Sequence, residues 1–250
     1  MTISRSSWQM LSFIALFVVW GVSLVGGFAF GEPSSDGLQR MPRWTRMGSS
    51  LILALIAWLA YAFTRSSTLG GYALLIAIGM TLGLIGDLLL AGVIAIPQPT
   101  LAGIAAFGLG HICYLSAALR LAGQLKLDAA GPRWSTLALM LLIGLVAWYL
   151  VVFRGQKPGA LTWASLPYAL LLATVAGLFL GLALQSPALI PTAIGALLFM
   201  ASDLILASQL FTGRAFPLIG DVIWLTYGPA QALIIASVLI VALTAGATLT

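Results

Sequence analysis

Long apolar stretches alternate with short polar ones along nearly the whole chain. A helix needs about 20 mostly apolar residues, at a rise of about 1.5 Å each, to cross a hydrocarbon core of about 30 Å. Eight segments meet this requirement, at residues 8–30, 48–64, 68–90, 100–121, 134–153, 163–184, 190–211 and 218–243. The pattern therefore predicts an all-α, polytopic membrane bundle of about eight transmembrane helices.

The positions of the prolines support the division into eight segments. Most prolines fall at or near the expected loops, but Pro167 and Pro229 lie inside the sixth and eighth segments, which they are predicted to bend. The first segment follows Arg5 without an evident cleavage site, so we expect a permanent span and not a signal peptide. Lysines and arginines number five on one set of loops and six on the other, which favours neither orientation.

Composition excludes a water-soluble domain. The 250 residues are 61% hydrophobic and 7% charged, whereas soluble domains carry roughly a quarter charged residues. The net charge of +5 comes from cations beside the apolar runs, so we expect loop anchors and no nucleic-acid partner. No stretch resembles a linker. We expect one domain over residues 1–250, in a multi-pass membrane protein of the cell membrane if the source is a bacterium.

The sequence contains few residues that could form disulfides or bind zinc. The single cysteine, Cys113, excludes an intrachain disulfide, and with the single histidine, His111, it disfavours catalytic zinc. An all-aspartate site for a harder cation stays open. We expect no cofactor and assign no metal ligand.

Two acidic residues lie well inside predicted spans. Asp87 and Asp203 each carry an insertion cost of roughly 3 kcal/mol, so each needs a reason to be there. One buried carboxyl group could serve helix packing, but two at similar places favour a function. Asp221 begins the last segment, where we expect it to be solvated.

Helical rise places several polar residues at similar depth. Asp87 lies near the end of its span, His111 roughly 16 Å along the returning helix, Asp203 roughly 12 Å before the end of the seventh span and Tyr227 roughly 14 Å into the eighth. All four fall in the same half of the bilayer. We therefore expect an acidic, hydrogen-bonding pocket open toward one leaflet.

The two halves of the chain resemble each other around these residues. The segment 86–92 is similar to 202–208, and His111 and Tyr227 each follow an aspartate by 24 residues. This similarity predicts a four-helix unit used twice in parallel. Taken alone, His111 fits a hydrogen bond to a neighbouring helix better than chemistry, and Tyr114 and Gln231 fit either role. Four glycines indicate close helix packing, not phosphate binding: Gly83, Gly86, Gly108 and Gly110.

Four motifs carry a resemblance to a known family. Residues 83–87 (GLIGD), 107–114 (FGLGHICY), 195–203 (GALLFMASD) and 227–234 (YGPAQALI) resemble, in order and spacing, the YhhN-like transmembrane family that includes lysoplasmalogenase. Family members often have a Lys-Pro pair entering the second helix, where this chain reads RWTRMG at 43–48 and keeps a cation.

The resemblance implies hydrolysis of the vinyl ether bond of a lysoplasmalogen to a fatty aldehyde and a glycerophospho-alcohol. That reaction needs a carboxylic acid to protonate the β-carbon and a carboxylate to stabilise the cation. It implies catalytic roles for Asp87, Asp203 and His111. It also implies substrate binding by Tyr114, Tyr227, Gln231, Arg43 and Arg46, with a lysophospholipid and the bilayer as partners and no protein partner predicted.

Two alternatives stay open. A proton-coupled transporter would also use intramembrane acids, a repeat and proline-bent helices. A hydrolase of another lysolipid would use a similar site.

Overall fold

A computed structural model describes residues 5–155 and 157–244, and within them it contains eight long helices and no strand. Each helix is long and apolar enough to cross a membrane, which confirms the predicted polytopic bundle. The helices are α1 Arg5–Phe30, α2 Arg43–Thr64, α3 Gly70–Leu90, α4 Pro99–Gln124, α5 Ala130–Trp148, α6 Ala160–Ala183, α7 Ile190–Thr212 and α8 Ile219–Thr244. A π-helical turn, Tyr149–Phe153, extends α5, and a 3-10 turn, Pro187–Leu189, precedes α7.

The helix boundaries differ from the predicted spans mainly at α2. It begins at Arg43 and not at Gly48, because the N–H groups of Thr45 and Arg46 already bond to the carbonyl of Pro42. Hydropathy marks where a helix enters lipid, whereas hydrogen bonds mark where it begins. Arg43 and Arg46 consequently lie on the first turn of α2.

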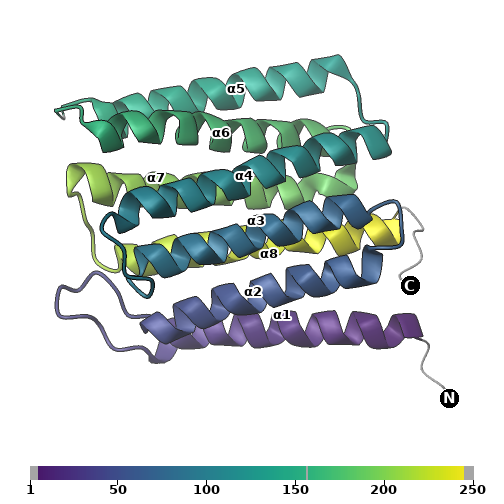
Figure 1. The fold of residues 1–250 in the computed structure, drawn as a ribbon, viewed down its shortest axis with the longest axis horizontal. Coiled ribbons are helices and arrows are strands. Elements are labelled where there is room, and N and C mark those ends of the chain that lie inside the picture. Colours follow the sequence, from purple (N-terminus) through teal and green to yellow (C-terminus); the bar gives the residue numbers. More distant parts are fainter. Residues whose placement is uncertain (1–4, 156, 245–250) are drawn as a thin grey trace.

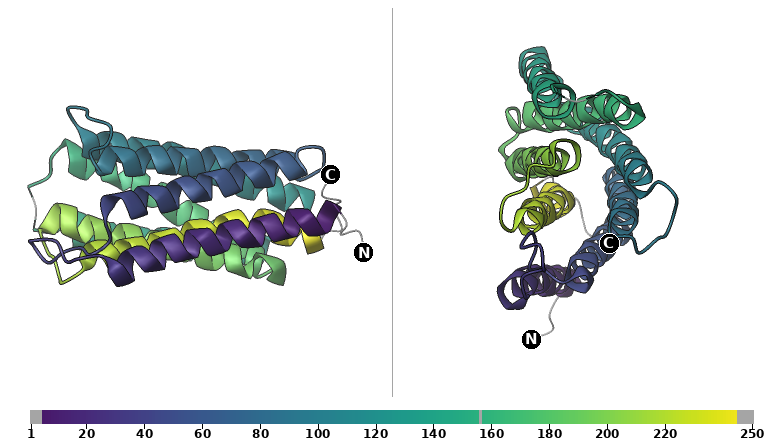
Figure 2. Two further views of the ribbon diagram at one scale, coloured as in Figure 1. Left: turned by 90° about the horizontal axis from the view of Figure 1, so that it is seen from below. Right: turned by 90° about the vertical axis from the view of Figure 1, so that its left-hand side faces the viewer.

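The helices form two facing rows capped by a pair. In the end-on view of Figure 2, α2, α3 and α4 make one curved row and α1, α8 and α7 face it, with α6 across one edge and α5 outside α6. Figure 1 shows the connections after α1, α3, α5 and α7 at one end of the bundle. The described starts of α1 and ends of α8 lie at the other end, so the chain crosses eight times.

Small residues allow the helices to approach closely, as predicted. A Cβ on Gly86 would lie 2.7 Å from the Phe107 ring, and one on Gly110 would lie 3.0 Å from the carbonyl of Gly79. On the other row, a Cβ on Gly195 would lie 2.7 Å from the carbonyl of Ala230. Small residues at such contacts are typical of membrane helix pairs.

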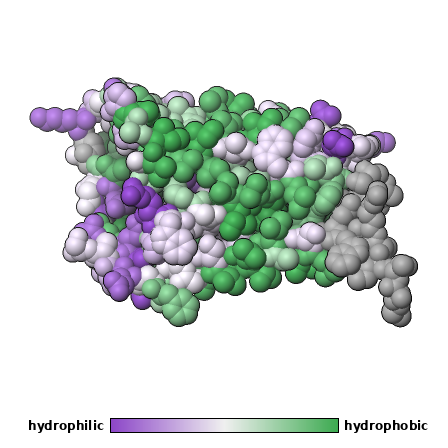
Figure 3. Space-filling view, turned by 60° about the horizontal axis from the view of Figure 1, so that its bottom comes forward, coloured by the Kyte–Doolittle hydropathy of each residue, from purple (hydrophilic) through white to green (hydrophobic). Residues whose placement is uncertain are grey.

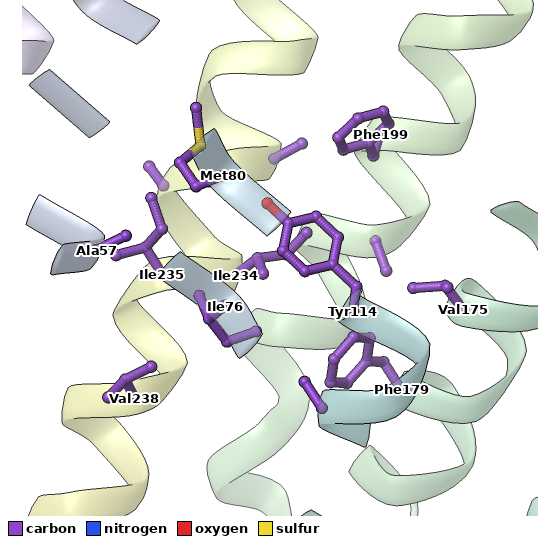
Figure 4. Packing of buried hydrophobic residues seen from close by; sticks show 14 of the residues in the cluster. Ala57, Ile76, Met80, Tyr114, Val175, Phe179, Phe199, Ile234, Ile235 and Val238 are labelled. Atoms are coloured by element: carbon purple, nitrogen blue, oxygen red, sulfur yellow. The ribbon is translucent and has the colours of Figure 1, made fainter. Parts of the chain in front are cut away.

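The centre of the bundle is apolar and its outer surface is apolar as well. Figure 4 shows Tyr114 between side chains of α3, α6, α7 and α8, among them Met80, Phe179 and Phe199. Figure 3 shows a broad hydrophobic band across the visible face, with hydrophilic residues toward its ends. An outer surface of this kind suits lipid as solvent.

Helix packing follows the pattern that a repeat would produce. α3 packs against α4 and α7 against α8, while α2 contacts α8 and α6 contacts α4. The last helix of each half thus packs against the second helix of the other half. The repeat stays a prediction with which this packing agrees. Pro167 and Pro229 lie inside α6 and α8, where the sequence placed them.

Candidate functional site

Asp87 is buried near the end of α3 and accepts two hydroxyl hydrogen bonds. Ser50 on α2 donates one, and Tyr227 on α8 donates the other over 2.9 Å. The residue is only 5% exposed. Three helices therefore fix the position of this acid.

A chain of hydrogen bonds continues from Asp87 into the bundle. Gln231 donates from Nε2 to the Tyr227 hydroxyl over 3.3 Å, and its Oε1 accepts from the Tyr114 hydroxyl over 2.7 Å. All three side chains are buried. Gln231 and Tyr114 lie behind Tyr227, outside the cavity lining, and hold its hydroxyl toward Asp87.

Asp203 on α7 occupies a comparable setting on the other side of the site. It accepts a hydrogen bond from the hydroxyl of Tyr168, which projects from α6. Each aspartate thus accepts a hydrogen bond from a hydroxyl group on the second helix of its own half of the chain. Asp203 and Asp87 line the same cavity, although they come from different helices.

Both aspartates line one cavity, which we call the polar cavity. Its volume is about 290 Å³, and it extends from the connection between α1 and α2 to Asp87, Asp203 and Tyr227. Polar side chains from several elements line it, including Arg46, Gln39 and Gln209. The sequence predicted one pocket with Asp87, His111, Asp203 and Tyr227, and the polar cavity contains these residues except His111.

Two buried donors in this cavity lack a protein acceptor. Arg46 Nε and Gln39 Nε2 are shielded from solvent, and neither bonds to any residue that the structure describes. Buried polar groups are usually paired, so unpaired donors point to a missing acceptor. The Arg46 guanidinium also lies over the Trp224 ring, 5.8 Å from its centroid. The part of the polar cavity beside Arg46 and Gln39 is therefore suited to a hydrogen-bond acceptor such as an anionic oxygen.

Arg43 and His111 lie outside the cavity lining. Arg43 is exposed and donates to the carbonyl of Ala91 over 3.3 Å. His111 is buried, with Nδ1 at 2.9 Å from the carbonyl of Phe107, and its ring packs edge-on against Phe199 and Tyr168. His111 contacts the tyrosine that bonds to Asp203, one step away from the carboxyl group.

The segment between α1 and α2 covers one end of the polar cavity and is fixed to α8 by Asp221. This acid is fully buried, so the expectation of a solvated position was wrong. Its carboxylate accepts the backbone N–H groups of Arg40 (2.6 Å) and Met41 (2.8 Å). Sequence position suggested an interface, but the returning segment folds over it.

Asp36 lies in the same segment and remains exposed at the polar cavity. Hydrogen bonds from the Ser34 hydroxyl (2.6 Å) and the Leu38 N–H (3.0 Å) hold the pKa of Asp36 below its ordinary value. The group is therefore ionised at neutral pH. Together with Arg46, it gives the polar cavity charges of both signs.

A second cavity, which we call the apolar cavity, begins on the far side of Asp203. Its volume is about 120 Å³, and α4, α5, α6 and α7 supply most of its lining. The two cavities share Leu90, Phe107, Asp203 and Leu206. Asp203 thus lies where a polar space and an apolar space meet.

Comparison with known families gives one match, which extends from residue 43 to residue 238 and includes every site residue above except the α1–α2 segment. The matching model is that of the YhhN family. The chain belongs to the YhhN family. Comparisons with curated proteins and with solved structures give no significant match.

The YhhN motifs in the sequence supply only part of the site. They contain Asp87, Asp203, Tyr227 and Gln231. The hydroxyl donors Ser50 and Tyr168 were missed, because serine and tyrosine in apolar helices give no pattern that separates a site from packing. Among residues 5–155 and 157–244, no group of three or more His, Cys, Asp or Glu side chains lies close enough together to hold a metal ion.

Proposed function

We propose that this YhhN-family membrane protein is a hydrolase that cleaves the vinyl ether bond of a lysoplasmalogen. The observation that carries the proposal is that Asp87 and Asp203, from two different helices, line one cavity that also contains the unpaired donor of Arg46. Vinyl ethers resist base and yield to acid. A pair of carboxyl groups shielded from bulk water suits that requirement better than a single one.

The proposed reaction proceeds in three steps. One carboxylic acid donates its proton to the β-carbon of the vinyl ether, which produces an oxocarbenium ion. The other carboxylate stabilises this cation and takes a proton from the water that adds to it, which gives a hemiacetal. Cleavage of the carbon–oxygen bond of the hemiacetal then releases a fatty aldehyde and a glycerophospho-alcohol, and proton exchange between the two carboxyl groups restores the pair.

The remaining side chains have supporting roles in this scheme. Arg46 and Gln39 bind the phosphate through their free donors, since guanidinium–phosphate hydrogen bonds are charge-assisted. Tyr227 and Tyr168 hold the carboxyl groups in place. His111 acts indirectly, through its packing against Tyr168.

Purified protein in detergent tests the proposal. Incubation with a lysoplasmalogen should release fatty aldehyde, whereas the saturated alkyl-ether analogue, which has no double bond to protonate, should remain intact. Other lysolipids in the same panel test the alternative substrate class. If no vinyl ether lipid releases aldehyde, and proteoliposomes that contain the protein take up a solute in a proton-dependent way, the protein is a proton-coupled transporter instead.

A further inference from the structure

The apolar cavity offers a ligand almost nothing polar to bind. Trp148 Nε1 donates to the Ser165 hydroxyl over 3.0 Å, and that hydroxyl donates to the carbonyl of Thr162 over 2.8 Å. The Tyr168 hydroxyl is used by Asp203. Asp203 is therefore the one polar group in the described lining that faces a neighbouring cavity, and the rest suits hydrocarbon.

The same cavity borders the lipid. Three of its lining residues, Ile143 on α5 and Leu204 and Leu210 on α7, are 43%, 38% and 42% exposed on the outer surface of the bundle. α5 and α7 pack mainly through α6 and the π-helical turn. The apolar cavity is the crevice between them, because residues of both helices line it. A hydrocarbon chain can enter this crevice sideways from the bilayer without crossing water.

We propose that the apolar cavity binds the hydrocarbon chain of the single-chain lipid whose headgroup lies in the polar cavity. This inference rests on the proposed function and specifies how its substrate lies. The two cavities meet at Asp203, and the vinyl ether is the group that joins an apolar chain to a polar glycerol. A lipid that fills both cavities places its scissile bond at that junction.

This position assigns different tasks to the two acids. The β-carbon is on the chain side of the ether oxygen, and Asp203 lines both cavities whereas Asp87 lines the polar one. Asp203 is thus the acid that reaches the β-carbon, and Asp87 is the carboxylate on the glycerol side. The aldehyde leaves between α5 and α7 into the bilayer, and the glycerophospho-alcohol leaves through the polar cavity.

Substitution of Ala147 tests where the chain lies. Ala147 lines the apolar cavity, whereas its neighbour Val146 faces lipid outside it and is the matched control. Ala147→Phe should lower the ratio of kcat/KM for a long-chain over a short-chain lysoplasmalogen at least about tenfold, the loss of roughly two methylene contacts. Val146→Phe should leave that ratio unchanged. Equal ratios in the two variants would overturn the inference.

Photo-crosslinking of the unmodified protein gives a readout that needs neither folding of a variant nor turnover. The probe is a saturated alkyl-ether lysophospholipid with a diazirine near the end of its chain. Labelling should fall on the α5 and α7 residues of the apolar cavity, and unlabelled long-chain lysophospholipid should compete for it. Labelling elsewhere, or without competition, contradicts the chain site. Competed labelling without aldehyde release would refute the hydrolase and leave the chain site standing.

Discussion

Asp87 and Asp203 are the residues on which the proposed chemistry depends most directly. Asparagine keeps their size and much of their hydrogen bonding but can neither ionise nor supply a carboxylic proton. Asp87→Asn and Asp203→Asn should each lower turnover by at least about a hundredfold, the low end for loss of a general acid or base. The measurement is aldehyde release, with binding of the saturated ether analogue as proof that the variant is folded.

The double variant separates a working pair from two independent contributors. Residues that act as a unit fail together, so the combined loss should be far smaller than the product of the single losses. Near-normal turnover in either single variant would defeat the paired mechanism. Loss of expression in place of activity would assign that aspartate to packing.

Tyr227 is expected to position Asp87 and not to react. Tyr227→Phe removes a hydroxyl donor from a carboxyl group, an interaction of roughly 1.5–3 kcal/mol, and should lower kcat about tenfold with little change in KM. The matched control is Tyr72→Phe, because Tyr72 is equally buried but bonds to Ser237, away from both cavities. An equal loss of kcat in the two variants would mean that Tyr227 acts through stability alone.

Arg46 and Arg43 are neighbours on one helical turn with different surroundings. Arg46 lines the polar cavity with a free donor, whereas Arg43 bonds to the carbonyl of Ala91 outside it. Arg46→Ala should therefore weaken lysophospholipid binding about tenfold or more while kcat changes little, since a phosphate contact acts in the ground state too. Arg43→Ala should have a smaller effect. Calorimetry with the saturated ether analogue would measure both, and an unchanged affinity in Arg46→Ala removes it from the site.

At the scale of elements, hydropathy was sufficient to predict the helices but not where they begin. The lipid-facing and buried surfaces of a membrane helix are both apolar, so the eight apolar runs were clear in the sequence. The first turn of α2 was missed because Arg43 and Arg46 are polar although helical. The burial of Asp221 was missed because it depends on how the α1–α2 segment returns over α8, which no local pattern records.

Asp221 should control the order of that segment. Asp221→Ala removes the acceptor of two backbone N–H groups, each worth roughly 1–3 kcal/mol when left buried and unpaired. The variant should unfold at lower temperature in detergent and be cleaved faster by protease between residues 31 and 42. Asp128→Ala, an exposed acid at the other end of the bundle, is the control. Equal protease resistance in both variants would show that other contacts fix the segment.

At the scale of the whole molecule, helical rise predicted the depth of the site residues but not which helices lie next to one another. Counting residues along four helices placed Asp87, His111, Asp203 and Tyr227 at one depth, and all of them except His111 line the polar cavity. The count could not show which helices are adjacent, so it gave no hint that Tyr168 bonds to Asp203. The apolar cavity could not be predicted from the sequence either, because it depends on the position of α5 outside α6.

The shared site finally requires one arrangement of the chain across the membrane. Gln98 and Arg214 are exposed in the connections after α3 and α7, and Asp128 is exposed in the connection after α4. In a Cys113→Ser background, Gln98→Cys and Arg214→Cys should react with a membrane-impermeant thiol reagent from the same side, and Asp128→Cys from the opposite side. Because Asp87 and Asp203 lie near the ends of helices that lead to Gln98 and Arg214, labelling of these two from opposite sides would put the acids in different leaflets. A single cavity with both carboxyl groups would then be impossible.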